Sequence, residues 1–185
     1  MNAAPLGKPV RMRVGVPAVL AFGSNLGDRA ATIRAAVDLL AEEPGIDVRA
    51  VSRLYETPAL KPEGIDEEAP AYLNAVALVH TLLEPLDLLG LINAVEDRLG
   101  RVREQRWGDR TLDIDIVDYG GIVSDDDPRI VLPHPRAHER AFVLVPWLDV
   151  DPGAQLPGYG PVSALAEQAT DPVRLWTDPA KGEQS

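Results

Sequence analysis

Hydrophobic residues recur along the 185-residue chain with two spacings. A spacing of three to four residues is typical of an amphipathic helix, and alternation with polar residues is typical of a strand. The pattern predicts helices at 29–43, 84–99, 138–148 and 162–168. It predicts strands at 14–22, 46–55, 71–80 and 112–118, followed by short extended pieces at 122–123, 130–132 and 173–176.

Turn and cap residues define where several of these elements end. Asp28 is a suitable N-cap for the first helix, and Pro44-Gly45 ends it. Gly120-Gly121 predicts a tight turn that leads into a return strand at 122–123. The acidic stretch 62–70 has no hydrophobic periodicity, so we expect a loop there.

The order of the first six elements indicates the fold class. They run β-α-β-β-α-β, which is the split βαβ pattern of the ferredoxin-like fold, an α+β arrangement within the broad α/β class. The length is ordinary for one domain, and no repeat or linker divides the chain. We therefore predict a single catalytic domain over 1–185, with flexible tails at 1–13 and 178–185.

The strand at 112–118 carries the first candidate chemistry. Asp113 and Asp115 share one face of it, because side chains alternate along a strand, and Leu112, Ile114 and Ile116 take the other face. The two carboxylates would lie roughly 6–7 Å apart, and at that distance they repel by roughly 2–3 kcal/mol. Oxygen ligands of this kind suit Mg²⁺. Alternating Asp and Ile is also the pattern of an ordinary half-exposed strand.

An arginine cluster directly upstream favours a role of the two acids in ligand binding or catalysis over the interpretation as an ordinary half-exposed strand. Arg101, Arg103, Arg106 and Arg110 precede the two acids within a short polar stretch. Guanidinium groups bind phosphate oxygens in a bidentate way, so arginines beside a Mg²⁺ site indicate a polyphosphate ligand.

Composition narrows the classes of function. Cysteine is absent, which excludes disulfides and thiolate zinc sites and predicts a cytoplasmic location. No apolar run approaches the roughly 20 residues of a membrane span. The formal net charge of −11 opposes nonspecific binding to nucleic acid or anionic membrane. We expect neither as a partner, and we expect a monomer.

Several motifs together resemble one known family. The stretch Arg106-Trp107-Gly108-Asp109-Arg110-Thr111-Leu112-Asp113-Ile114-Asp115-Ile116 is similar to the most characteristic motif of the 6-hydroxymethyl-7,8-dihydropterin pyrophosphokinases. Further motifs of that family follow the same order along the chain: Gly23-Ser24-Asn25-Leu26-Gly27-Asp28, Tyr55-Glu56-Thr57-Pro58, Tyr72-Leu73-Asn74, Gly100-Arg101-Val102-Arg103 and Pro133-His134-Pro135-Arg136. The resemblance covers roughly residues 19–147.

The resemblance implies a fold and a reaction. It implies a three-layer α/β/α sandwich, in which a hairpin and C-terminal helices are added to the ferredoxin-like core. It implies transfer of a diphosphate group from ATP to the hydroxymethyl oxygen of a reduced pterin, with release of AMP, in folate biosynthesis. It also implies two Mg²⁺ ions as cofactors and ATP as co-substrate.

The resemblance also implies roles for individual residues. Catalysis is assigned to Arg101, Arg110, Asp113 and Asp115, of which the two aspartates bind the Mg²⁺ ions. Pterin contacts are assigned to Thr57, Pro58, Leu60, Tyr72, Asn74, Trp107 and Phe142. ATP contacts are assigned to Glu96, Arg103, Arg106, Arg110, Ile116, His134 and Arg140. For several of these a plainer role is open: His134 could cap loop backbone, and Tyr72 and Phe142 could be ordinary core residues.

Three departures from the family pattern bear on the site. Asp109 and Ala59 stand where many members have proline, and Pro135 replaces an aromatic residue found in some members. Two other functions remain open. One is a different Mg²⁺-dependent phosphotransferase or nucleotidyltransferase on the same fold. The other is an RNA-binding module, although aromatic residues make up only 5% of the chain. A P-loop ATPase is disfavoured because the chain has no Walker A sequence.

Overall fold

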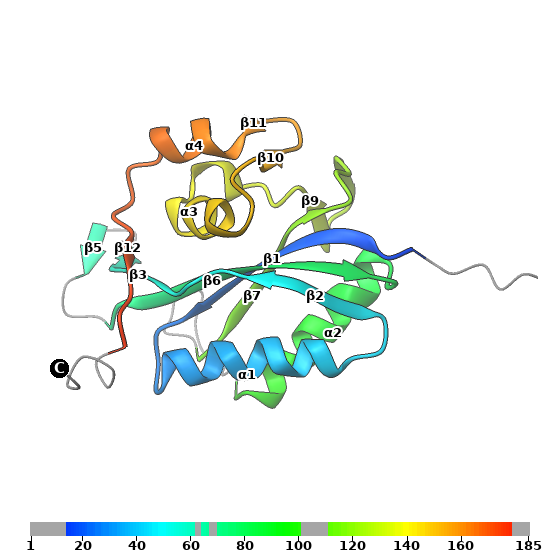
Figure 1. Cartoon of the computed structure of the whole chain (residues 1–185), viewed down its shortest axis with the longest axis horizontal. Coiled ribbons are helices and arrows are strands. Elements are labelled where there is room, and N and C mark those ends of the chain that lie inside the picture. The colour runs from blue at the N-terminus through cyan, green and yellow to red at the C-terminus, as the bar shows by residue number, and fades with distance from the viewer. Residues whose placement is uncertain (1–13, 62–63, 67–69, 101–110, 179–185) are drawn as a thin grey trace, which may run out of the picture.

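The computed structural model describes residues 14–61, 64–66, 70–100 and 111–178. Of the two predicted tails, it describes only Asp178. Its main feature is a six-stranded antiparallel sheet (Figure 1). The sheet comprises β1 (Val16–Ser24), β2 (Ile46–Val51), β3 (Tyr55–Thr57), β6 (Tyr72–Thr81), β7 (Asp113–Tyr119) and β12 (Arg174–Leu175).

The strand order confirms the predicted ferredoxin-like core. The path through the sheet is β12-β3-β6-β1-β7, and β2 also pairs with β6. Both β1 and β2 are antiparallel to β6, so they run parallel to each other with β6 between them. That is the split βαβ arrangement, and β7 completes it on the far side of β1.

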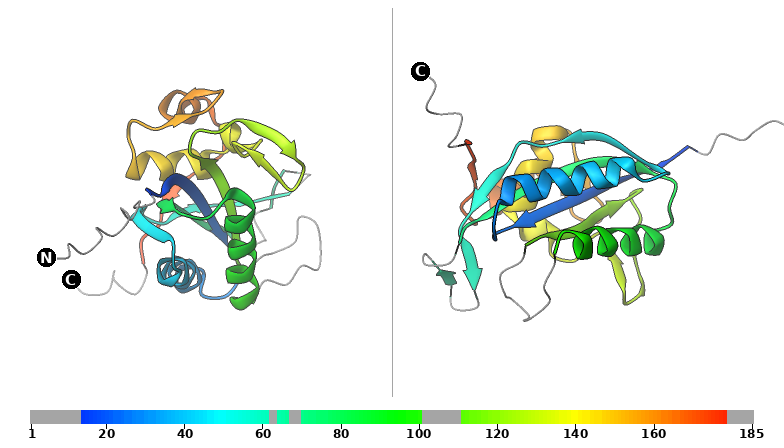
Figure 2. Two further views of the ribbon diagram at one scale, coloured as in Figure 1. Left: turned by 90° about the vertical axis from the view of Figure 1, so that its right-hand side faces the viewer. Right: turned by 90° about the horizontal axis from the view of Figure 1, so that it is seen from below.

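Helices cover both faces of the sheet, as the three-layer prediction requires. Helices α1 (Arg29–Glu42) and α2 (Pro85–Arg98) lie on one face, and α3 (Ala141–Val150) and α4 (Val162–Gln168) lie over the other (Figures 1 and 2). Asp28 caps α1 as predicted, since its side chain accepts a hydrogen bond from the Ala31 amide at 2.9 Å. None of the helices in the described ranges combines the length and apolarity that crossing a bilayer requires.

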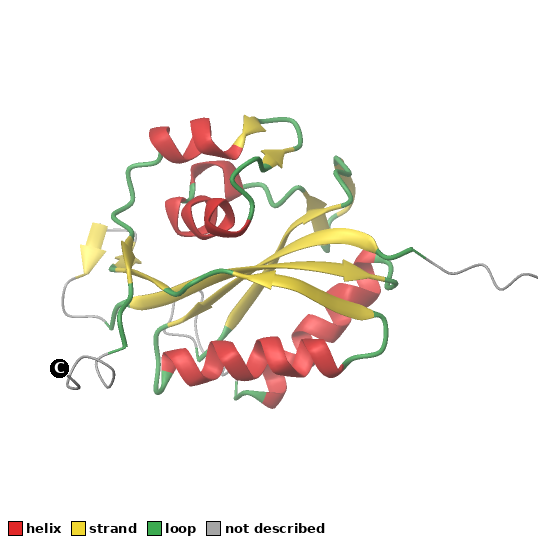
Figure 3. Ribbon diagram, viewed as in Figure 1, coloured by secondary structure: helices red, strands yellow, loops and turns green. Residues whose placement is uncertain are grey.

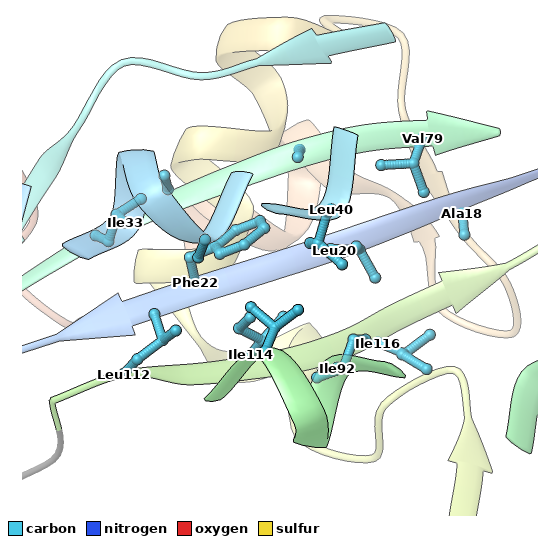
Figure 4. Packing of buried hydrophobic residues seen from close by; sticks show 14 of the residues in the cluster. Ala18, Leu20, Phe22, Ile33, Leu40, Val79, Ile92, Leu112, Ile114 and Ile116 are labelled. Atoms are coloured by element: carbon cyan, nitrogen blue, oxygen red, sulfur yellow. The ribbon is translucent and has the colours of Figure 1, made fainter. Parts of the chain in front are cut away.

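Alternation along the strands divides the core into two layers. In β6, Leu73, Ala75, Ala77 and Val79 pack towards α1 and α2, whereas Val76 packs towards α3. Below the sheet, Leu20, Ile92 and Ile114 come from three different elements and meet in one buried cluster (Figure 4). Each such side chain contributes about 1.5–3 kcal/mol when it is fully buried, so this cluster fixes the helices beneath the sheet.

Short hairpins account for most departures from the predicted elements (Figure 3). The stretch 62–70, expected as a loop, contains β5 (Gly64–Asp66), which pairs with β4 (Ala59–Lys61) just before it. The predicted return strand at 122–123 is wrong; Ile122 completes the turn after β7, and the hairpin is β8 (Ser124–Asp127) with β9 (Ile130–Leu132). Near the C-terminus, β10 (Gln155–Leu156) pairs with β11 (Gly160–Pro161). Pairs this short follow local turns and leave little hydrophobic pattern.

The strand predicted at 46–55 is interrupted. Strand β2 ends at Val51 and β3 begins at Tyr55. At the break, the hydroxyl of Ser52 accepts a hydrogen bond from the Val76 amide at 2.9 Å, and the Ser52 amide donates to the Val76 carbonyl. A side chain thus replaces one backbone bond of the ladder, and β3 starts with a new register that leads towards the site.

Candidate active site

A cleft of about 750 Å³ lies on the α3 side of the sheet. Strands β1, β3, β6 and β7 contribute to it, together with the loop after β9, the start of α3 and the segment after α4. It brings together the following predicted site residues: Thr57, Pro58, Tyr72, Asn74, Asp113, Asp115, His134, Arg140 and Phe142.

Small residues in β1 form the floor of the cleft. Gly23 pairs with Asn74 of β6 on one side and with Asp113 of β7 on the other. Ala21 lies in the same way between Val76 and Asp115. Neighbouring strands are about 4.8 Å apart, so this register places Asn74 and Asp113 roughly 10 Å from each other across a glycine. A flat ligand can therefore span from the amide to the acids.

The two aspartates point towards the cleft, as strand alternation predicts. Both line it, whereas Leu112, Ile114 and Ile116 between and beside them are buried in the core below the sheet. The Asp115 side chain is 37% exposed, which leaves its carboxylate open to a ligand. The sequence interpretation of a strand with one apolar and one acidic face is confirmed.

Two basic side chains approach Asp115. Arg140 Nη1 lies 3.5 Å and His134 Nε2 lies 3.7 Å from its Oδ2. Arg140 reaches the cleft because the predicted helix at 138–148 is interrupted there; the 3-10 turn η1 (Ala137–Glu139) ends at Arg140, whose backbone is extended, and α3 begins after it. Burial lowers the pKa of Arg140, although Asp115 opposes that shift.

His134 has the backbone-capping role that the sequence left open, and it also lines the cleft, where its ATP contact stays a prediction. Its Nδ1 accepts a hydrogen bond from the Arg136 amide at 3.1 Å, so it does cap loop backbone. That bond leaves Nε2 as the nitrogen that faces Asp115. Burial lowers the pKa of His134, and nearby Arg140 adds to this effect, while Asp115 raises it. Because Nδ1 accepts the bond from the Arg136 amide, the ring carries its proton on Nε2 and can donate from there to an anionic ligand.

An amide and two aromatic rings form the other end of the cleft. The Asn74 side chain is 4% exposed, and its Nδ2 donates to the Thr57 hydroxyl at 3.0 Å and to the Tyr55 carbonyl at 3.3 Å. These bonds fix the orientation of the carboxamide. Tyr72 and Phe142 also line the cleft, and the Arg140 guanidinium lies 5.4 Å from the Phe142 ring centre. Asn74, Tyr72 and Phe142 together form a slot that suits a planar heterocycle with polar edges.

Two residues assigned to ATP contacts have side chains that lie in the core below the sheet. Glu96 is only 1% exposed, and its Oε1 accepts a hydrogen bond from the Ile114 amide at 2.8 Å. The Ile116 side chain is buried in the cluster below the sheet. Neither residue belongs to the described lining of the cleft. The helical and strand spacings direct both side chains into the core, away from the cleft face of the sheet, and their assigned roles stay predictions.

Part of the predicted site lies outside the described residues. This holds for Arg101, Arg103, Arg106, Trp107 and Arg110, and for the side chain of Leu60, whose backbone belongs to β4. Their assigned roles stay predictions.

Several lining residues were missed by the sequence interpretation. Arg136 lies in the quoted motif Pro133-His134-Pro135-Arg136, which could have indicated it, and Glu139 pairs with it at the edge of the cleft. Thr170 and Asp171 come from the segment after α4, where no motif indicated a site.

A second hollow of about 670 Å³ lies on the α1 side of the sheet. Helix α1, residues 51–54 and residues 175–178 line it. Its described lining includes none of the predicted site residues, and it is more open than the cleft. The grouping of acids, bases and aromatic rings identifies the first cleft as the candidate active site.

The sheet and cleft define an enzyme of the ferredoxin-like α+β class, with a small-molecule site on one face of an antiparallel sheet. Residues 19–152 match the model of the family described as 7,8-dihydro-6-hydroxymethylpterin-pyrophosphokinase (HPPK). The chain belongs to this family.

Named relatives agree with the family model. The chain is 45% identical over 150 residues to the 2-amino-4-hydroxy-6-hydroxymethyldihydropteridine pyrophosphokinase of Methylorubrum extorquens, which covers 81% of this chain and 92% of that protein. It is 37% identical over 159 residues to the protein of the same name from Bacillus subtilis, with 86% and 89% covered.

A solved structure shows the same fold. The crystal structure of Plasmodium falciparum HPPK-DHPS with pteroate covers 86% of this chain, with a TM-score of 0.63 and 16% sequence identity. This chain spans 43% of that longer chain. At this level of identity the likeness concerns the fold alone.

Proposed function

We propose that this protein transfers a diphosphate group from ATP to the hydroxymethyl oxygen of 6-hydroxymethyl-7,8-dihydropterin, and that it releases AMP in a step of folate biosynthesis. Membership of the HPPK family and the names of the relatives support this proposal. The single structural observation that carries it is the register Asn74–Gly23–Asp113, which joins a heterocycle slot to a pair of acids.

The pterin end of the cleft consists of Asn74, Tyr72 and Phe142 in this proposal. The Asn74 side-chain amide nitrogen already donates to Thr57 and Tyr55. Its side-chain oxygen can therefore accept a hydrogen bond from a pterin N–H. Tyr72 and Phe142 would stack against the ring, which is worth roughly 0.5–1.5 kcal/mol per aromatic pair beyond the buried area. Asn74 and Asp113 lie roughly 10 Å apart, so a pterin bound at Asn74 can extend its hydroxymethyl arm to the acids.

Asp113 and Asp115 would hold two Mg²⁺ ions. Among the described residues, no group of three or more His, Asp or Glu side chains is arranged to hold a metal by itself. Two carboxylates alone still fit Mg²⁺, which commonly binds one or two protein carboxylates and completes its shell with water and substrate phosphates. When bound, the ions would neutralise the phosphate oxygens and lower the pKa of the attacking hydroxyl.

The basic side chains would bind the ATP phosphates beside the acids. Arg140 and His134 already lie within 4 Å of Asp115, at 3.5 and 3.7 Å, and can donate to phosphate oxygens from there. Arg136 lines the same part of the cleft. We assign Arg110 and Arg101 to stabilisation of the transferred group, and Arg103 and Arg106 to ATP binding, on their place in the family motif.

The decisive experiment identifies both products. The purified protein is incubated with ATP, Mg²⁺ and 6-hydroxymethyl-7,8-dihydropterin, and products are measured by mass spectrometry. We expect AMP and the pterin diphosphate in equal amounts, and neither with Asp115→Asn or with excess EDTA. ADP as the product would instead indicate a simple phosphotransferase, and free diphosphate would indicate a nucleotidyltransferase.

We also propose that the enzyme acts as a monomer in the cytoplasm. The absence of cysteine is compatible with a reducing compartment. Light scattering after size exclusion should give a mass near 20.0 kDa, and about twice that value would contradict the monomer.

A further inference from the structure

The chain returns to the cleft after α4. Thr170 and Asp171 line it, and three residues later β12 adds to the sheet as an edge strand on β3 (Figure 1). This segment lies beyond residues 19–152, which match the family model. A segment beyond the stretch that the family model matches therefore forms one wall of the candidate active site.

An ion-pair network fastens this segment to β3. The Arg174 Nε donates to Glu56 Oε2 at 2.9 Å, and Arg174 pairs with Glu56 in the strand register. Arg29, the first residue of α1, donates to the other oxygen of the same carboxylate at 3.1 Å. The Trp176 amide donates to the Leu54 carbonyl at 2.9 Å, which extends the contact between this segment and the chain before β3 by one residue.

The Glu56 side chain lies on the face of the sheet opposite to the cleft. Its side chain is 13% exposed, and in the register it pairs with Leu73, whose side chain packs below the sheet. The next residue, Thr57, points to the opposite face and accepts the hydrogen bond from Asn74. The carboxylate thus holds the strand that orients the pterin-facing amide.

We propose that the segment 170–176 contributes to pterin binding at the pterin end of the cleft. Arg174 is a positioning residue: through Glu56 it seats β12 on β3 and holds Asp171 at the cleft. The Asp171 carboxylate favours a ligand edge rich in N–H donors, such as the amino edge of a reduced pterin. This inference rests on the proposed function and adds residues to the same site.

Two substitutions test the proposal without removing the core. In Arg174→Ala the KM for the pterin should rise about fivefold, the size expected when one largely exposed ion pair is lost. The KM for ATP and kcat should stay within about twofold, and Tm should change little, because the Arg174 side chain is 78% exposed. Asp171→Asn should raise the pterin KM in the same way, because it removes the charge with almost no change of shape.

Two further variants separate positioning from general packing. Arg174→Lys keeps the positive charge and should restore the pterin KM to within about twofold of wild type. The matched control is Arg49→Ala, which removes the exposed pair between Arg49 and Asp47 on β2, at 2.8 Å and away from the cleft. It should leave every kinetic parameter unchanged.

The double variant decides whether Arg174 acts through Asp171. If it does, Asp171→Asn should add little to the pterin KM in the Arg174→Ala background, since the two changes affect one contact. Unchanged pterin KM values in both single variants, or an equal loss of kcat with a lowered Tm, would overturn the inference. Either result leaves the proposed function intact as long as the wild type makes AMP; a wild type that makes none refutes the function itself.

Discussion

The buried carboxylate of Glu96 accepts a hydrogen bond from the Ile114 amide, and Ile114 is the residue that separates Asp113 from Asp115. The bond is 2.8 Å long and links the last turn of α2 to the backbone of β7. An acid on one face of the sheet therefore fixes the strand segment whose two acids point to the other face.

Replacement of Glu96 should disturb both stability and turnover. Glu96→Ala leaves the buried Ile114 amide without this acceptor, which should lower the free energy of unfolding by about 1–3 kcal/mol. Turnover should fall as well, because Asp113 and Asp115 lose their fixed spacing. Glu96→Gln keeps an oxygen acceptor and should lie close to wild type in both. Urea denaturation and AMP formation measure the two effects; a fully active, fully stable Glu96→Ala would show that the bond does not position the strand.

The aspartate pair should be required for transfer but not for folding. Asp113→Asn and Asp115→Asn each remove one negative charge from an open cleft, so turnover should fall at least about 10²-fold, the cost of losing a group that stabilises the transition state. Their Tm should stay close to that of wild type, since relief of the repulsion between the two carboxylates offsets the lost attraction of Asp115 to Arg140. Near-full turnover in either variant would remove the metal-site assignment.

Gly23 should be required for the space on the sheet floor. A Cβ at this position would lie 3.6 Å from Asn74 Oδ1 and 3.9 Å from Tyr72 Cδ1, so a small side chain fits without a clash. Gly23→Val extends further between Asn74 and Asp113 and should weaken pterin binding at least about tenfold, while the strand itself tolerates a β-branched residue. Calorimetry with pterin checks the affinity. A normal affinity would mean that the pterin does not lie on this floor.

Phe142 should contribute mainly to pterin affinity. Phe142→Ala removes a partly buried ring from the cleft, and loss of a stacking contact with part of its buried area should weaken binding about 5- to 30-fold. Titration in the presence of a nonhydrolysable ATP analogue measures this. Val123→Ala, at a residue that is 68% exposed and outside the described cleft lining, serves as the control. A change in ATP affinity alone would place Phe142 at the wrong end of the cleft.

Asp149 should make stability depend on acid pH. Hydrogen bonds from the Arg53 side chain and amide lower the pKa of Asp149 against the effect of burial. The unfolded chain then binds a proton at higher pH than the folded protein does. The stabilisation is therefore complete above the ordinary pKa of 3.8 and is lost as the pH falls through the lower folded value.

The matching measurement compares unfolding of wild type and Asp149→Asn across pH 2 to 7. We expect Asp149→Asn to cost about 1 kcal/mol at neutral pH and to converge with wild type at the acid end. Asp47→Asn is the control, because its pair with Arg49 is exposed on both sides. Parallel curves for Asp149→Asn and wild type would contradict the assignment.

Much of the fold could be predicted from local pattern. Asp28 does cap α1, Gly100 follows α2, and the alternation in β6 divides its side chains between two layers as expected. The hairpin β4–β5 and strand β8 could not be predicted in this way, because three or four residues with few apolar positions give no periodicity. The extended piece predicted at 130–132 is confirmed as β9. The break at Ser52 depends on a hydrogen bond to Val76, which is distant in the sequence.

The sequence by itself determined the face of β7 on which Asp113 and Asp115 lie, and the family motifs indicated Asn74 and His134. Strand alternation is a local property, and motifs are contiguous, so neither needs the rest of the chain. Only the tertiary structure decided that Gly23 lies between Asn74 and Asp113, that Glu96 is a support for β7, and that Asp171 lines the cleft. Each of these depends on sheet register or helix packing between distant segments, and a linear pattern contains no record of those distances.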